Sequence, residues 1–160
     1  MQTDAQPITD ALIAMGAGWD DLSDVVLTHA YPEHCGALLT VALRAPSAVI
    51  WGVSGDTFPT AARPAEDRTV IHGLRVVSAP GHTPGHLCLL DEGAGIGFAG
   101  DAIGSQLGGL TQGPQMFIAD AQQAARSLQR LVELRPDRML FGHGGEVAKP
   151  ADTLANFPTP

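Results

Sequence analysis

The sequence predicts an α/β fold in which short apolar strands each lead into a loop that carries a histidine or a carboxylate. Apolar runs at residues 24–28, 47–51 and 87–90 have the length and composition of buried strands. Residues 120–134 place apolar side chains at helical spacing, and the pattern ends before Pro136. Strands and helices that alternate along a chain of 160 residues are typical of one layered α/β domain.

The remaining elements follow from turn residues and apolar runs. Thr9 predicts the start of a short helix over residues 10–15, and a second helix over 35–43 stops ahead of Pro46. Two strand pairs are expected after a loop at 52–67, the first turning at His72 and Gly73. The expected pairs are 69–71 with 74–78, and 87–90 with 96–99.

The C-terminal third contains one long loop and one strong helix. Residues 102–117 are rich in glycine and predict a loop that forms part of a substrate mouth. The helix at 120–134 leads to a last strand at 138–141. We expect residues 146–160 to be a trailing tail of a single domain that spans residues 1–160.

Histidines and carboxylates gather at the ends of the apolar runs. The stretch from Thr28 to Gly36 holds His29, Glu33 and His34, and later loops add His82, Asp101 and His143. Imidazole nitrogen and carboxylate oxygen are the ligands of zinc-type ions, so the pattern favours a metal site over separately packed histidines. Alternatives stay open: Asp101 as a turn residue, Glu33 as a solvated charge, and Cys35 as a small thiol rather than a ligand.

These motifs resemble the metallo-β-lactamase fold, a superfamily that includes glyoxalase II, lactonases, ribonuclease Z and zinc β-lactamases. The first family motif, T-H-x-H-x-D-H-x-G, is matched by Thr28, His29, Tyr31, Glu33, His34 and Gly36. Tyr31 therefore replaces a histidine and Glu33 replaces an aspartate. The later motifs match at His82, Asp101 and His143, and His86 fits a structural role in the G-H-T-x-G-H element.

The resemblance implies a four-layer αβ/βα metallo-β-lactamase sandwich that lacks the first N-terminal strands, because only 28 residues precede His29. A homodimer could cover the region of the missing strands, since an uncovered edge strand promotes association. The small number of preceding residues also raises the alternative of a truncated or degenerate relative. That relative would bind a metal or a partner with little or no catalysis.

The resemblance also implies two metal positions that share Asp101. The first would take His29, the residue at position 31 and His82, and the second would take Glu33, His34 and His143. Zn²⁺ is the expected ion, one or two per chain, with iron or manganese as alternatives. Tyrosine is a poor ligand at neutral pH, and glutamate reaches about 1.5 Å further than aspartate. We therefore expect one firmly held ion at the second position.

The implied activity is hydrolysis by a metal-bound hydroxide that attacks a small ester, thioester, lactone or related bond. Glu33 would steer the attack and take part in proton transfer. A metal-dependent oxygenase or redox branch of the same fold is a less favoured interpretation.

Charge and composition narrow the partners. The net charge of −8 argues against a nucleic-acid backbone and leaves a small molecule as the expected substrate. Two cysteines do not form a disulfide framework. The N-terminal residues lack a signal-peptide pattern, and no apolar run could cross a membrane, so we expect a cytoplasmic protein.

Overall fold

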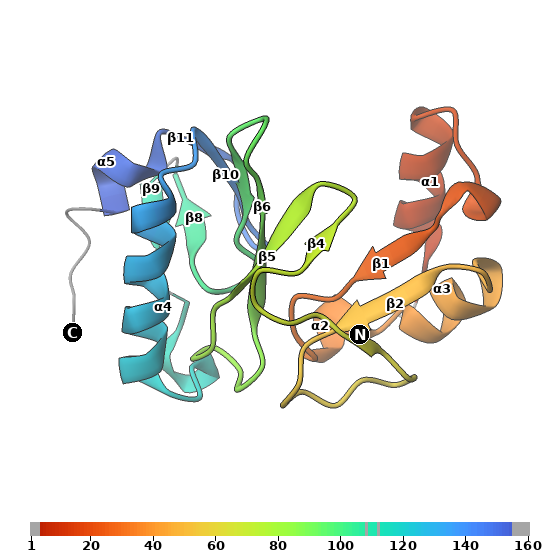
Figure 1. Ribbon diagram of the computed structural model, residues 1–160, viewed down its shortest axis with the longest axis horizontal. Helices are drawn as coiled ribbons and strands as arrows, with labels where there is room; N and C mark the ends of the chain where they lie inside the picture. The colour runs from red at the N-terminus through yellow and green to blue at the C-terminus, as the bar shows by residue number, and fades with distance from the viewer. Residues whose placement is uncertain (1–3, 108, 112, 155–160) are drawn as a thin grey trace.

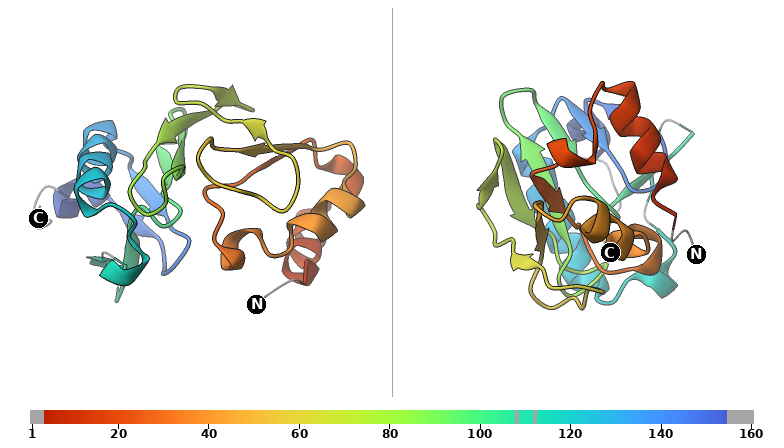
Figure 2. Two further views of the ribbon diagram at one scale, coloured as in Figure 1. Left: turned by 90° about the horizontal axis from the view of Figure 1, so that it is seen from below. Right: turned by 90° about the vertical axis from the view of Figure 1, so that its right-hand side faces the viewer.

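The computed structural model describes residues 4–107, 109–111 and 113–154, and these form four layers (Figure 1). The outer layers are helix α4 (Ala121–Leu134) on one side and helices α1 (Gln6–Ala14) and α3 (Leu38–Arg44) on the other. Figure 2 shows the two β-sheets between them from other directions. The expected αβ/βα sandwich is confirmed.

The first sheet contains three parallel strands in the order β1 (Asp24–Val26), β2 (Val49–Gly52) and β3 (Arg63–Pro64). Val25 pairs with Ile50, so the two apolar runs lie side by side in register. Among described residues 4–23 no strand precedes β1. The one-turn helix α2 (Pro32–Cys35) packs on this sheet together with α3, and the 3-10 helix η1 (Trp19–Asp21) lies between α1 and β1 in the chain.

The second sheet has six strands in the order β11-β10-β7-β6-β5-β4. Strands β4 to β7 form an antiparallel meander, β10 joins β7 in parallel, and β11 closes the edge. Their bounds are Val70–Ile71, Leu74–Ser78, Leu87–Asp91, Ile96–Phe98, Arg138–Leu140 and Val147–Ala148. Both expected strand pairs are present.

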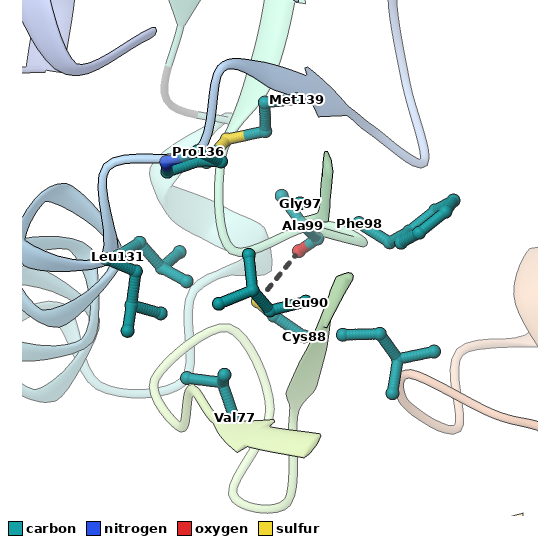
Figure 3. Close-up of a pocket in the computed structure, with 11 residues that line it drawn as sticks. Val77, Cys88, Leu90, Gly97, Phe98, Ala99, Leu131, Pro136 and Met139 are labelled. Carbon is teal, nitrogen blue, oxygen red and sulfur yellow. Dashed lines mark hydrogen bonds between the residues drawn. The ribbon is translucent and has the colours of Figure 1, made fainter. Parts of the chain in front are cut away.

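Three apolar clusters hold the layers together. One lies between the six-stranded sheet and α4, where Figure 3 shows Cys88, Leu131 and Met139 around a small apolar hollow. The Cys88 thiol donates a hydrogen bond to the Ala99 carbonyl there, and burial raises the pKa of that thiol to about 12. The second cluster joins the two sheets, and the third joins the first sheet to α2 and α3.

Several boundaries differ from the sequence-based expectation. Helix α1 begins at Gln6, and its first turn contains Pro7, a residue that fits there because its missing N–H has no helical partner. Thr9 therefore lies inside the helix, where its hydroxyl donates to the Ala5 carbonyl over 3.2 Å. The single helix expected at 35–43 is instead two helices, α2 and α3. The loop at 52–67 contains the short strand β3.

The two C-terminal irregular segments are also more ordered than expected. The segment 102–117 holds a hairpin of β8 (Gly104–Gln106) with β9 (Gly109–Thr111) and the 3-10 helix η2 (Gln115–Phe117). A trailing tail directly after Glu146 is wrong for the described part, since β11 and α5 (Pro150–Leu154) lie there. Residues 108, 112 and 155–160, which belong to those two expectations, lie outside the described residues. No described helix has the length and apolar character needed to cross a membrane.

Candidate metal centre

The predicted site residues come from loops that follow four different strands. His29 and the turn of α2 with Glu33 and His34 follow β1. The α2 turn starts at Pro32, whose backbone angle suits a first helical position, and it places Glu33 and His34 one after the other. His82 lies between β5 and β6, Asp101 follows β7, and His143 follows β10. The sequence spacing alone could not show whether these loops meet.

They meet around one carboxylate oxygen. Oδ2 of Asp101 lies 3.2 Å from Nε2 of His34 and 3.5 Å from Nε2 of His143. The same oxygen lies 3.7 Å from Nε2 of His82 and 3.9 Å from Nε2 of His29. Four imidazoles, two from the first motif and one each from the loops of His82 and His143, therefore lie with a nitrogen close to Asp101.

Glu33 belongs to the exposed side of this cluster. One ligand atom each from Glu33, His34 and His143 lies within 4.8 Å of the others, and the same holds for His29, His34 and Asp101. His29 is buried, whereas Glu33 and His143 are exposed. The six predicted residues thus form one cluster that runs from the protein interior to the surface.

The donor atoms of the cluster lack protein partners. Among the described residues, Nε2 of His29, His34 and His82 and Oδ1 of Asp101 are buried and make no hydrogen bond of acceptable geometry. Buried polar atoms without partners are rare in folded proteins because each costs about 1–3 kcal/mol. A metal ion would satisfy several of them together, so the residues present fit the ion that the family resemblance implies.

The protonation states also suit a cation. Burial lowers the pKa of His29 to about 4, with the positive charge of a protonated His34 adding to the effect. Burial likewise lowers the pKa of His82. Burial alone would raise the pKa of Asp101, but the neighbouring imidazoles, His34 foremost, hold it below its usual value of 3.8. At neutral pH the two buried imidazoles are neutral and Asp101 is ionised, which are the forms that bind metal.

Two positions beside Asp101 have room only for glycine, because neighbouring side chains lie close to the backbone there. Gly100 has a φ of +53°, and a Cβ there would lie 2.8 Å from Nε2 of His86. A Cβ on Gly142 would collide with Oδ1 of Asp101 and would lie 2.7 Å from the His34 ring. Any side chain at position 142 would therefore fill the space between these two candidate ligands.

His86 fixes the backbone of Asp101 through a hydrogen bond. The backbone N–H of Asp101 donates to Nε2 of His86 over 3.0 Å, and burial lowers the pKa of His86 to about 3. A permanently neutral imidazole can accept that hydrogen bond at any physiological pH. The structural role expected for His86 is confirmed by this contact.

Tyr31 packs against the cluster but directs its hydroxyl elsewhere. Its ring centroid lies 4.8 Å from that of His82 and 5.2 Å from that of His29. Its hydroxyl donates to the Phe117 carbonyl over 3.1 Å. Tyr31 therefore acts as a packing and hydrogen-bonding residue that attaches η2 to the first histidine loop.

Two residues that the sequence left open have structural roles. The Cys35 thiol is buried and donates to the Ala30 carbonyl over 3.4 Å, and burial raises its pKa. His72 lies at its hairpin turn and contacts Asp24, 2.6 Å from Nε2 to Oδ2. Neither contact involves the cluster around Asp101.

Asp56 is a residue of the site that sequence reasoning missed. Its Oδ2 accepts hydrogen bonds from the Ala30 N–H and the Thr83 hydroxyl, both at 2.9 Å. Its Oδ1 accepts the Gly85 N–H at 3.0 Å. One carboxylate in the 52–67 loop thus joins the loop that carries His29 to the loop that carries His82.

A cavity of about 610 Å³ opens beside the cluster. Part of its lining comes from the cluster and its neighbour, through Tyr31, Glu33, His82, Asp101 and His143. The rest of its wall comes from the 102–118 segment, through Gly104, Ser105, Gln106, Thr111, Gly113, Pro114 and Phe117. The expectation that this segment forms a substrate mouth is therefore consistent with its position.

Known proteins share both the sequence motifs and the architecture. Residues 2–143 match the family model of the metallo-beta-lactamase superfamily. The chain is 28% identical to YobT of Bacillus subtilis (strain 168), over 83% of this chain and 72% of that protein. It is 32% identical to a hydroxyacylglutathione hydrolase of Aeromonas salmonicida (strain A449), over 86% of this chain but 52% of that enzyme. The chain spans about half the length of such hydrolase relatives.

Solved structures show the same fold. The metallo-beta-lactamase family protein TTHA1429 from Thermus thermophilus superposes with a TM-score of 0.78 at 19% identity, over 98% of this chain and 66% of that one. TTHA1623, solved in a di-iron-bound form, gives a TM-score of 0.77 at 24% identity, over 93% and 82%. With the family model matched over most of its length, the chain belongs to the metallo-beta-lactamase superfamily, whose members are metal-dependent.

Proposed function

We propose that the protein is a metal-dependent hydrolase that cleaves an ester, thioester, lactone or related bond in a small molecule. The observation that carries the proposal is the convergence of four imidazole nitrogens within 3.2–3.9 Å of Asp101 Oδ2, beside a cavity of about 610 Å³. Their buried donor atoms lack other partners. A purely structural cluster would satisfy those atoms within the protein.

The donor set favours one firmly held ion over two. His34, Asp101 and His143 offer three ligand groups for one ion and leave a fourth position for water, as in catalytic zinc sites, with the Glu33 carboxylate beside them. Beside His29 and His82, position 31 holds a tyrosine in place of a third histidine. The Tyr31 hydroxyl does not replace that ligand, because it donates a hydrogen bond to the Phe117 carbonyl. Zinc is our first choice of metal, with iron or manganese as alternatives, since imidazole and carboxylate suit all three.

A metal ion held here would supply Lewis acidity and lower the pKa of a bound water from about 15.7 to about 7. The chain supplies the rest. Asp101, fixed through its N–H by His86, keeps the donor nitrogens oriented. The exposed carboxylate of Glu33 stands at the cavity end of the cluster, where it can accept a proton and pass it to a leaving group. Tyr31 and Phe117 provide apolar surface that limits access of water.

The curated relatives support the thioester end of this range. Several of them are hydroxyacylglutathione hydrolases, enzymes whose name states a thioester substrate class. Because the chain spans about half of their length, we propose from them only the type of bond that is cleaved, a thioester, and not the identity of the substrate.

A second candidate function is metal or partner binding with little catalysis. The specific observation that favours it is Tyr31, which replaces a ligand histidine and hydrogen-bonds to the backbone of Phe117. A site that needs two ions would be incomplete in this form. Metal content and turnover together distinguish the two candidates.

The test combines elemental analysis with a substrate panel. The purified protein should contain about one equivalent of transition metal and should cleave at least one ester, thioester or lactone faster than the Asp101→Asn variant does. Asp20→Asn is the matched control, since Asp20 is exposed and lies in η1. Metal binding without turnover of any panel member would select the second candidate, and absence of bound metal would contradict the hydrolase and leave only partner binding.

A further inference from the structure

The wall of the cavity has an unusual charge pattern. Residues 102–118, which form most of it, include no Asp, Glu, Lys, Arg or His. All nine Lys and Arg residues of the protein fall within the described part of the chain, and none of them lines the cavity. The ionisable groups that do line it are those of the metal cluster and its neighbour: Glu33, Asp101, Tyr31, His82 and His143.

Five of the eight arginines also have partners away from the cavity. Arg75 pairs with Glu92, Arg130 with Asp67, and Arg138 with Glu146. Arg44 and Arg63 lie over the rings of Trp19 and Trp51. A carboxylate on a bound substrate would therefore find no guanidinium or ammonium group on the cavity wall.

The residues of the metal cluster do not add a Lys or Arg to the lining either. The part of the lining that belongs to the metal cluster holds the carboxyl groups of Glu33 and Asp101 beside the imidazoles of His82 and His143, with no guanidinium or ammonium group. Carboxylate recognition in proteins relies on Arg or Lys with charge-assisted hydrogen bonds. What the wall offers instead is Ser105, Gln106 and the apolar surfaces of Pro114 and Phe117.

From this wall we propose that the substrate is an electrically neutral acyl compound, not a carboxylate-bearing conjugate such as a glutathione thioester. The inference rests on the proposed function, because it describes the molecule that the same site would hydrolyse. Neutral hydrogen-bonding groups and apolar surface suit an uncharged ester, lactone or short thioester. Glutathione carries carboxylates at both ends and would leave them unpaired against this wall.

A binding experiment tests the substrate class without requiring turnover. Two anilides of the same shape are compared: 4-methyl-N-phenylpentanamide, which is neutral, and succinanilate, which has a carboxylate in place of the terminal isopropyl group. Ligand-observed NMR titration gives both dissociation constants, with and without one equivalent of zinc. The neutral anilide should bind more tightly in both forms, by about tenfold, the cost of one poorly compensated charge.

A positively charged side chain on the cavity wall should reduce the difference in affinity between the neutral anilide and succinanilate. Gln106 is exposed and lines the cavity, so Gln106→Lys should improve succinanilate binding by about threefold, as expected for one partly exposed ion pair. Gln106→Met removes the side-chain amide without adding a charge, so it shows how much of the change in binding comes from loss of the amide alone. Gln129→Lys adds the same charge to an exposed position on α4 away from the cavity and should leave the ratio of the two dissociation constants unchanged.

The outcomes separate this inference from the proposed function. Equal or tighter binding of succinanilate by the unaltered protein overturns it, as does no detectable binding of the neutral anilide up to its solubility limit. An equal response of Gln106→Lys and Gln129→Lys also counts against a role for the wall. Preferential binding of the neutral anilide without hydrolysis of any ester would support the inference while contradicting the proposed hydrolase.

Discussion

Removal of the Asp56 carboxylate should loosen the metal centre without touching any candidate ligand. Asp56 accepts the N–H groups of Ala30 and Gly85 and the hydroxyl of Thr83 at 2.9–3.0 Å. Each hydrogen bond to a charged group contributes about 1.5–3 kcal/mol. The Asp56→Ala variant loses all three together.

The expected loss of stability is smaller than the simple sum. Asp56 is half-buried, so water can replace part of what is lost, and the Thr83 hydroxyl can rotate toward another acceptor. The two backbone N–H groups dominate, at about 1.5 kcal/mol each, which gives about 3 kcal/mol. For a chain of this length that corresponds to a fall in melting temperature of about 6–12 °C.

The assay has two readouts. Thermal unfolding followed by circular dichroism gives the melting temperature, and competition with a metal chelator gives zinc affinity. Because Asp56 joins the loops of His29 and His82, zinc affinity should fall about 10- to 100-fold, as for other residues that orient metal ligands. Asp56→Asn keeps a carbonyl acceptor and should lie between the wild type and Asp56→Ala. Asp20→Ala, at an exposed position, is the control. A melting temperature within about 2 °C of the wild type and an unchanged zinc affinity would refute this reasoning.

Four further predictions concern the ligand set, pH, metal removal and assembly. Tyr31→His should raise tightly bound metal from about one to about two equivalents, measured by elemental analysis; unchanged stoichiometry would contradict the account of Tyr31. Partial burial raises the pKa of Asp67, but the Ser78 N–H and Arg130 together lower it below its usual value of 3.8, so its stabilising effect is present above that pH and is lost on acidification. The difference in unfolding free energy between the wild type and Asp67→Asn should therefore shrink as the pH falls below about 4; a constant difference would exclude this effect. Chelation of the metal should lower the melting temperature, because an ion that binds only the folded chain stabilises it; an unchanged transition in the apo-protein would count against the site. The homodimer expected for the N-terminal layer should give about twice 16.6 kDa by light scattering, and Leu43→Glu, at an apolar side chain that is 83% exposed, should give monomer; a wild-type monomer would exclude it.

The convergence of the site residues could be predicted because each follows an apolar run. A loop that follows a strand lies at an edge of the sheet. Once the layered fold was recognised, His82, Asp101 and His143 could therefore be expected to lie close together. The order of the motifs identified the fold for the same reason. A ligand role for Tyr31 was disfavoured because a phenol is a poor ligand at neutral pH, and its hydrogen bond to the Phe117 carbonyl agrees with this.

Asp56 could not be found in this way. It lies in a segment without apolar periodicity, and two of its three partners are backbone N–H groups that no residue pattern reveals. The β8–β9 hairpin was missed because its strands of three residues are rich in glycine and polar residues and carry no strand signal. Thr9 suggested a helix start by its type, but the proline two residues earlier determines where α1 begins.

The most direct test of the central claim is anomalous diffraction from crystals of the protein grown with zinc, recorded on both sides of the zinc absorption edge. We expect one strong anomalous peak per chain in contact with His34, Asp101 and His143. The same crystals of Asp101→Asn should show that peak weakened or lost. A wild-type map with no peak at Asp101, or with its strongest peak elsewhere on the chain, would contradict the assignment of this cluster as a metal centre.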